Sequence, residues 1–228
     1  MNRTLFSRVL YYFVRKFILI VYHLLFRGVY YGWKNIPAKG RVIIACNHQS
    51  HLDPPIVGSG ATRTVSFMAR ETLFRGWFGQ YISAINAFPI DKEHPLGGIK
   101  EALRRLKLDE CVAVFPEGSR TYDGELQEFL PGLIAIAQKT KSPIVPAAIE
   151  GAHDAMPRCE NGRVHFFKKI AVRFGEPIPV ETVTSLSPED LLELVRLRII
   201  ENLNELRKMP AFQNKPQIES ASELERRE

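Results

Sequence analysis

Short apolar segments typical of β-strands alternate with segments of helical periodicity along most of the chain, and this alternation is the strongest constraint on its fold. Strands are predicted over 41–46, 64–68, 87–90, 111–115 and 143–149, with a hairpin over 164–174 that turns at Lys168-Lys169. Helices are predicted over 96–108, 132–140 and 187–209, and a further helix starts at Asp53 as its N-cap. The alternation indicates an α/β fold with a mixed, largely parallel sheet flanked by helices.

The composition fits one folded domain. With 228 residues, 45% hydrophobic and 25% charged, the chain is long enough for one full core. We expect this domain over 32–209, after an N-terminal helical region over 1–31 and before a loose polar tail over 210–228. Three cysteines without paired spacing fit a reducing cytoplasmic compartment, and Cys46 is expected to be a core residue and not a nucleophile.

The N-terminal region is basic and aromatic. Residues 1–52 hold eight Lys or Arg and no Asp or Glu, and ten of the chain's 23 aromatic residues lie before Lys34. Periodicity predicts an amphipathic helix over 5–26, and its composition suits the headgroup zone of an anionic membrane. Because Arg15 and Lys16 interrupt its apolar run, we expect the helix to lie along the membrane surface and not to cross it. The alternative is a core helix of a soluble protein.

A histidine and an aspartate follow the strand over 41–46, in the segment N-H-Q-S-H-L-D over 47–53. A histidine that a carboxylate orients can take a proton from an alcohol near neutral pH. We therefore predict that His48 is a general base and that Asp53 holds its ring in the useful tautomer. By itself, this spacing also fits a loop histidine beside a helix N-cap.

A second polar segment, P-E-G-S-R over 116–120, follows the strand over 111–115. Arg120 can bind a phosphate with two parallel hydrogen bonds, and Gly118 lets backbone N–H groups approach an anion. Glu117 is expected to orient Arg120 or a substrate hydroxyl. The alternative is a surface turn with a local ion pair. Because ligands gather beyond the carboxyl ends of parallel strands, His48 and Glu117 are expected to share one site.

These two segments resemble the first and third sequence blocks of the glycerolipid acyltransferases, which make phosphatidic acid from lysophosphatidic acid. The segment over 47–53 is similar to N-H-x-S-x-x-D, whose histidine is the catalytic base. The segment F-P-E-G-S-R over 115–120 is similar to F-P-E-G-T/S-R, which binds the acceptor's glycerol phosphate. I-V-P-A-A-I-E-G over 144–151 resembles the fourth block. The resemblance runs over about residues 32–176 and implies a glycerol-phosphate acyltransferase-like fold, with Glu117, Gly118, Ser119 and Arg120 as acceptor-binding residues.

Three positions, Asn86, Lys92 and Leu130, depart from the family pattern. The second block, normally G-x-F-x-x-x-R, is here N-A-F-P-I-D-K over 86–92, so Lys92 replaces the phosphate-binding arginine. Lys92 keeps the positive charge but lacks the bidentate fork. Leu130 stands where the family often has a lysine. With fewer phosphate ligands, another lysophospholipid or a lipid alcohol becomes an alternative acceptor.

The resemblance implies acyl transfer from acyl-CoA or acyl carrier protein to the hydroxyl of 1-acyl-sn-glycerol-3-phosphate, which gives phosphatidic acid in phospholipid biosynthesis. The alcohol itself attacks the thioester, so we expect no Ser or Cys acyl-enzyme, no cofactor and no metal. We expect the enzyme on the cytoplasmic face of a membrane, peripheral or monotopic. Its expected partners are a lysophospholipid, the acyl donor and anionic lipids.

Three other functions fit parts of the sequence. His48, His51 and Asp53 could form a two-His-one-carboxylate metal site of a lipid hydrolase, although metal ligation does not account for the segment over 117–120. A non-catalytic membrane lipid-binding protein is the second alternative. Nucleic-acid binding would fit the net charge of +6, but the excess charge belongs to the N-terminus, so nucleic acid is not expected as a partner.

Overall fold

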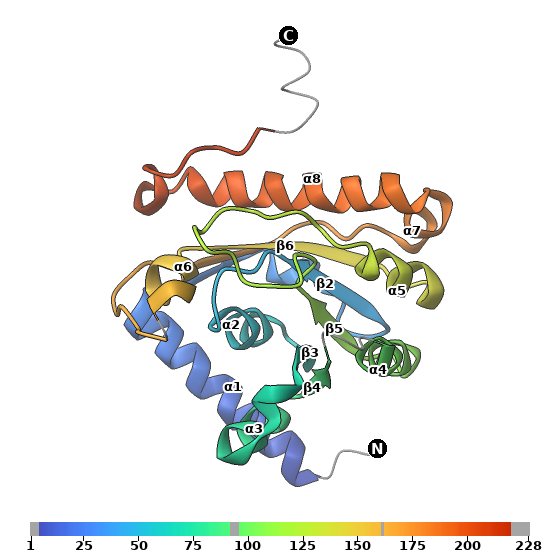
Figure 1. Cartoon of the computed structure of the whole chain (residues 1–228), viewed down its shortest axis with the longest axis horizontal. Helices are drawn as coiled ribbons and strands as arrows, with labels where there is room; N and C mark the ends of the chain where they lie inside the picture. The colour runs from blue at the N-terminus through green and yellow to red at the C-terminus, as the bar shows by residue number, and fades with distance from the viewer. Residues whose placement is uncertain (1–4, 92–95, 161, 220–228) are drawn as a thin grey trace.

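The computed structural model describes residues 5–91, 96–160 and 162–219. Its centre is a seven-stranded sheet in the order β1-β7-β6-β2-β5-β3-β4 (Figure 1). The strands are β1 (Val29–Tyr31), β2 (Val42–Cys46), β3 (Val65–Arg70), β4 (Ala87–Ile90), β5 (Cys111–Val114), β6 (Ile144–Glu150) and β7 (Ala171–Phe174). Among the pairs of neighbouring strands in the described residues, β6–β7 alone is antiparallel. The predicted mixed and largely parallel sheet is therefore confirmed.

Helices cover both faces of this sheet. They are α1 (Leu5–Phe26), α2 (Asp53–Gly60), α3 (Gly76–Ala84), α4 (Leu96–Lys107), α5 (Gly132–Thr140), α6 (Ala152–Ala155), α7 (Val180–Ser185) and α8 (Pro188–Arg207). β2 is buried along its whole length because its side chains alternate between two apolar layers. Ile44 packs in the layer that α1 and α2 cover, and Ile43 in the layer that α4, α5, α7 and α8 cover. Figure 1 shows α8 running across its face of the sheet, opposite α1 and α2.

One side of α1 packs on the protein and the other faces solvent. Tyr22 is buried, and its hydroxyl donates to the carbonyl of Val29 at 2.8 Å. Arg15 donates from Nε to the carbonyl of Ser59, near the end of α2. The other side exposes apolar residues: Phe13, Phe17, Ile20 and Leu24, each 57–68% exposed. By length and composition, the segment Val9–Phe26 could also cross a membrane, with a mean hydropathy of 1.6.

Three local predictions are wrong. Asp53 is not the N-cap of α2, because Leu52 holds that position and Asp53 is the first helical residue. Residues 164–174 do not form a hairpin, since β7 pairs with β6 and β1, and the turn lies at Phe166 and Phe167. The segment after Pro210 is not loose in its described part. Phe212 is buried there, and the main-chain N–H of Ile218 donates to Asn204 at 2.8 Å.

The sheet topology brings polar residues from distant parts of the chain to one edge. β3, β5, β2 and β6 are neighbouring parallel strands, so their carboxyl ends meet at the same edge. His48 follows β2, and Glu117 follows β5. Arg70 ends β3, and Glu150 ends β6. This edge therefore gathers polar residues that can form a site.

Candidate active site

The His48 side chain is held on two sides beyond the end of β2. Its Nδ1 lies 2.7 Å from Oδ2 of Asp53, and its ring stacks on Phe115 with the ring centroids 4.3 Å apart. An ionised carboxylate only accepts hydrogen bonds, so Nδ1 carries the proton and Nε2 keeps its lone pair. The His48 side chain is 17% exposed, which leaves this base within reach of a substrate.

The Asp53 carboxylate is fully buried and is held by the loop before it. Besides His48, its Oδ2 accepts the main-chain N–H groups of Gln49 at 2.6 Å and Ser50 at 2.7 Å. Oδ1 is buried with no hydrogen-bond partner, the one such side-chain atom in the part of the chain that the structure describes. The buried negative charge lies where it can stabilise the imidazolium that proton transfer creates.

Glu117 connects the two polar segments. Its Oε1 accepts the main-chain N–H of His48 at 2.7 Å, and its Oε2 accepts that of Gln127 at 3.2 Å. Main-chain amides occupy both carboxylate oxygens, and Glu117 forms no hydrogen bond or ion pair with Arg120, so the first of its two predicted roles is not seen. The predicted contact with a substrate hydroxyl stays a prediction. Burial raises the pKa of Glu117 to about 8, although the two amides favour its charged form. Glu117 therefore adds little negative charge to the site near neutral pH.

The turn after β5 requires a glycine and leaves an arginine unpaired. Gly118 has a φ of +66°, and a Cβ there would lie 2.6 Å from Cδ1 of Leu130. Ser119 and Arg120 follow, both half-buried. Neither side chain forms a hydrogen bond or ion pair with another described residue. The guanidinium of Arg120 is thus available to a ligand anion.

Two arginines that the sequence analysis did not single out act on Arg120: Arg158 contacts its main chain, and Arg70 lies close enough for its charge to affect it. Arg158 donates from Nη1 to the main-chain carbonyl of Arg120 at 2.7 Å, and its guanidinium lies 3.9 Å from the centre of the Tyr122 ring. Burial and the charges of Arg158 and Arg70 lower the pKa of Arg120. Neither Arg70 nor Arg158 forms a salt bridge with a described carboxylate. The three guanidinium groups form a positive cluster, which we call the arginine cluster, suited to a phosphate dianion.

His51 lies near the same cluster. Burial, together with the positive charge of Arg120, lowers the pKa of His51 to about 4, so its ring is neutral near pH 7. Of the predicted phosphate ligands, Lys92 lies outside the described residues. Asn86 replaces the family's glycine at a φ of +75°, a left-handed conformation that Asn tolerates better than most residues.

Comparison with known proteins now identifies the family. The acyltransferase family model matches residues 28–150, more than half of the chain. The chain belongs to the acyltransferase family. It is 31% identical over 179 residues to the 1-acyl-sn-glycerol-3-phosphate acyltransferase of Bacillus subtilis, covering 77% of this chain and 86% of that protein. It is 28% identical over 190 residues to the enzyme of the same name from Saccharomyces cerevisiae, covering 79% of this chain and 61% of that protein.

A solved structure agrees with this result. The crystal structure of the 1-acyl-sn-glycerophosphate (LPA) acyltransferase PlsC from Thermotoga maritima matches this acyltransferase with a TM-score of 0.76 at 28% identity. The match covers 89% of this chain and 82% of that one. The predicted fold class and the predicted enzyme class, an O-acyltransferase, are both confirmed.

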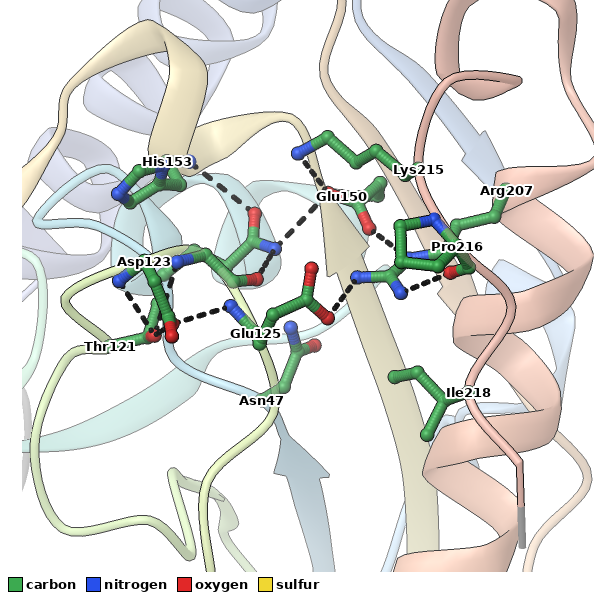
Figure 2. Close-up of polar contacts among 12 residues, drawn as sticks. Asn47, Thr121, Asp123, Glu125, Glu150, His153, Arg207, Lys215, Pro216 and Ile218 are labelled. Atoms are coloured by element: carbon green, nitrogen blue, oxygen red, sulfur yellow. Dashed lines mark hydrogen bonds and ion pairs between the residues drawn. The ribbon is translucent and has the colours of Figure 1, made fainter.

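A buried ionic network lies beside the loops of the candidate site in the acyltransferase (Figure 2). Glu150 is fully buried and accepts hydrogen bonds from Nε of Arg207 at 2.8 Å and from Lys215 at 2.9 Å. Arg207 also pairs with Glu125 at 3.0 Å. The side-chain amide of Gln49, next to His48, donates to Glu150 at 3.1 Å. The network therefore links α8 and the segment after it to the loop of His48 through Gln49, and to the chain after Arg120 through Glu125.

Two alternatives from the sequence gain no support. Cys46 of the acyltransferase is fully buried, and burial raises the pKa of its thiol well above the usual value, so it does not supply a thiolate nucleophile. Within residues 5–91, 96–160 and 162–219, no group of three His, Cys, Asp or Glu side chains could hold a metal ion. The two-His-one-carboxylate arrangement that the hydrolase alternative needs is thus missing from the described region.

Proposed function

We propose that this acyltransferase moves a fatty acyl group from a thioester to the hydroxyl of 1-acyl-sn-glycerol-3-phosphate and forms phosphatidic acid in phospholipid biosynthesis. One observation carries the proposal: the His48–Asp53 pair lies next to the segment of Arg120, since the main-chain N–H of Thr121 donates to the carbonyl of His48 at 2.9 Å, and Arg120 has no carboxylate partner among the described residues. The names of the curated relatives support the same acceptor.

The reaction follows from the tautomer of His48. Nε2 takes the proton of the acceptor hydroxyl as its oxygen attacks the thioester carbonyl, and Asp53 stabilises the imidazolium. The tetrahedral intermediate then collapses, the carbon–sulfur bond breaks, and the imidazolium returns the proton to the departing thiolate. The products are the ester and a free thiol. General base catalysis of this kind contributes about 10²- to 10⁴-fold in rate.

The arginine cluster binds the acceptor's phosphate in this proposal. Arg120 supplies the bidentate contact that the third block implies, and Arg70 and Arg158 add guanidinium groups with the bidentate fork that Lys92 lacks. Ser119 and the backbone at Gly118 complete the anion site. Because the raised pKa of Glu117 keeps it largely uncharged, it does not repel the phosphate.

Association with a membrane brings the enzyme to its lipid acceptor. We propose that α1 lies along the cytoplasmic face of a membrane, while acyl-CoA or acyl carrier protein arrives from the cytoplasm. Support comes from the packing of α1, whose Tyr11 hydroxyl accepts the main-chain N–H of Val65 at 3.2 Å and whose Tyr22 lies in the core. A helix that docks one side on the protein and exposes apolar residues on the other suits an interfacial position.

A screen of acceptors tests the proposal. Wild-type protein with labelled acyl-CoA or acyl carrier protein should acylate lysophosphatidic acid faster than lysophospholipids with larger headgroups. Arg120→Ala should raise the acceptor KM by about tenfold or more and leave the donor KM unchanged. Arg198→Ala is the matched control, since this exposed arginine of α8 pairs only with Glu201 among the described residues. Lack of turnover with any lysophospholipid, or an effect of Arg120→Ala on the donor alone, would contradict it.

A further inference from the structure

The turn between α6 and β7 exposes two adjacent aromatic rings. Phe166 is 54% exposed and Phe167 is 63% exposed, and neither takes part in the site described above. Large apolar side chains in water forgo the burial that normally stabilises them. Two neighbouring rings in solvent therefore call for a partner that covers them.

The structure holds this turn in place. Phe167 has a φ of +64°, an unfavourable conformation for a bulky residue, and its main-chain N–H donates to the carbonyl of Leu25 at 2.6 Å. The ring of Phe166 lies 6.2 Å from that of Phe26, centroid to centroid. The turn is thus tied to the C-terminal end of α1, where Figure 1 shows the chain before β7 beside that helix.

Basic residues flank the two rings along the chain. Lys168 and Lys169 follow directly, Arg163 precedes, and Arg27 comes directly after α1. None of these four forms a salt bridge with a described carboxylate. Aromatic rings next to unpaired basic groups match the anionic headgroup layer of a bilayer, where the rings enter the interface and the cations meet phosphates.

We propose that this turn, residues 163–169, and the exposed side of α1 form one docking surface for an anionic lipid bilayer. The inference rests on the membrane association in the proposed function. Its physical reason is orientation, because a single helix on a membrane can roll about its own axis. A second anchor beyond the end of the helix removes that freedom and fixes the angle at which the carboxyl edge of the sheet meets the lipid.

Vesicle binding tests the inference with the full-length protein. The probes are vesicles of phosphatidylcholine alone and vesicles that also contain phosphatidylglycerol. Phe166→Ser/Phe167→Ser should bind the anionic vesicles about tenfold or more weakly than wild type. Lys168→Gln/Lys169→Gln should bind them about tenfold to thirtyfold more weakly. Phe13→Ser/Phe17→Ser, on α1, should also weaken binding.

Matched controls lie on and directly after α4, which packs on the opposite face of the sheet from α1. Leu96→Ser/Leu108→Ser removes two equally exposed apolar residues, and Lys100→Gln/Lys107→Gln removes two exposed lysines. Both should bind like wild type. Thermal unfolding and turnover of a short-chain, water-soluble acceptor should be the same for the turn variants and wild type, which shows that fold and site are intact.

The outcomes separate the two proposals. If wild-type protein does not bind either kind of vesicle, the membrane association in the proposed function fails. If wild type and the α1 variant differ but both turn variants bind like wild type, the docking role of the turn is wrong and the proposed function stands. Binding of wild type to phosphatidylcholine as tight as to anionic vesicles would overturn the assigned lipid charge.

Discussion

At the residue scale, two carboxylates hold His48 in place. Asp53 reaches back from the start of α2 to Nδ1, and Glu117 reaches across from the neighbouring strand to the main chain of the same histidine. One carboxylate thus sets the tautomer and the other sets the backbone. The five-residue spacing of His48 and Asp53 made the first contact predictable from the sequence.

Asp53→Asn should lower kcat by about 10³-fold or more and change the acceptor KM little, because the amide no longer fixes the Nδ1–H tautomer. Steady-state kinetics with labelled acyl donor measure this effect. Asp190→Asn, at an exposed position near the start of α8, is the control that loses the same charge. A variant with unchanged kcat would show that Asp53 does not orient the base.

The raised pKa of Glu117 predicts that the stability of the folded protein depends on pH. Its pKa is raised from an ordinary value of 4.5 to about 8, so the folded protein holds the proton more tightly than the unfolded chain. This stabilisation is complete below about pH 4.5 and is lost as the pH rises through 8. Between pH 5 and 8, the unfolding free energy of wild type should fall relative to Glu117→Gln by about 2–4 kcal/mol. Urea unfolding measures it, with the exposed Glu181→Gln as control, and parallel curves would contradict the shifted pKa.

The arginine cluster shows what residue spacing cannot predict. Arg158 lies 38 positions after Arg120 and donates a hydrogen bond to its main-chain carbonyl. No local sequence pattern predicts this contact. Arg70 could have been found, because it ends a strand parallel to β5 and so lies at the edge where ligands gather. The contacts of Glu117 with main-chain amides were likewise not predictable from residue spacing.

At the element scale, strongly periodic segments were predictable and tertiary turns were not. The predicted bounds of α1, β4 and α5 agree with the structure. The hairpin over 164–174 failed because the hydrogen bond from Phe167 to the end of α1 sets that turn, and this contact joins residues 142 positions apart. The N-cap prediction failed because the Asp53 side chain bonds to the loop before α2.

The buried ionic network predicts how much Arg207 of α8 contributes to the stability of the protein. Arg207→Met should lower the unfolding free energy by about 3–5 kcal/mol, because it removes one of two cations from the buried Glu150 carboxylate. The double variant Glu150→Gln/Arg207→Met should lose less than the sum of the two single variants, with a coupling of about 1 kcal/mol or more. Urea unfolding of the four proteins measures the coupling, and additive losses would mean that the pair does not act as a unit.

At the scale of the whole molecule, the parallel order of the sheet explains why one edge holds the site. Residues from four strands meet there although 80 positions separate Arg70 from Glu150. The alternation of strands and helices predicted this sheet. The antiparallel direction of β7 depends on its pairing with β6, and the docking of the segment after Pro210 depends on contacts such as that of Ile218 with Asn204, which no local pattern indicates. Since α1 places Tyr22 and Phe26 in the core, point substitutions on its exposed side test its role more cleanly than its deletion would.

The central claim is that the imidazole of His48 takes the proton of the acceptor hydroxyl. Its most direct test is the turnover number of His48→Ala with lysophosphatidic acid and a labelled acyl donor, beside wild type and with equal thermal stability verified. The account predicts a loss of about 10²- to 10⁴-fold or more in kcat. Turnover equal to that of wild type would contradict it.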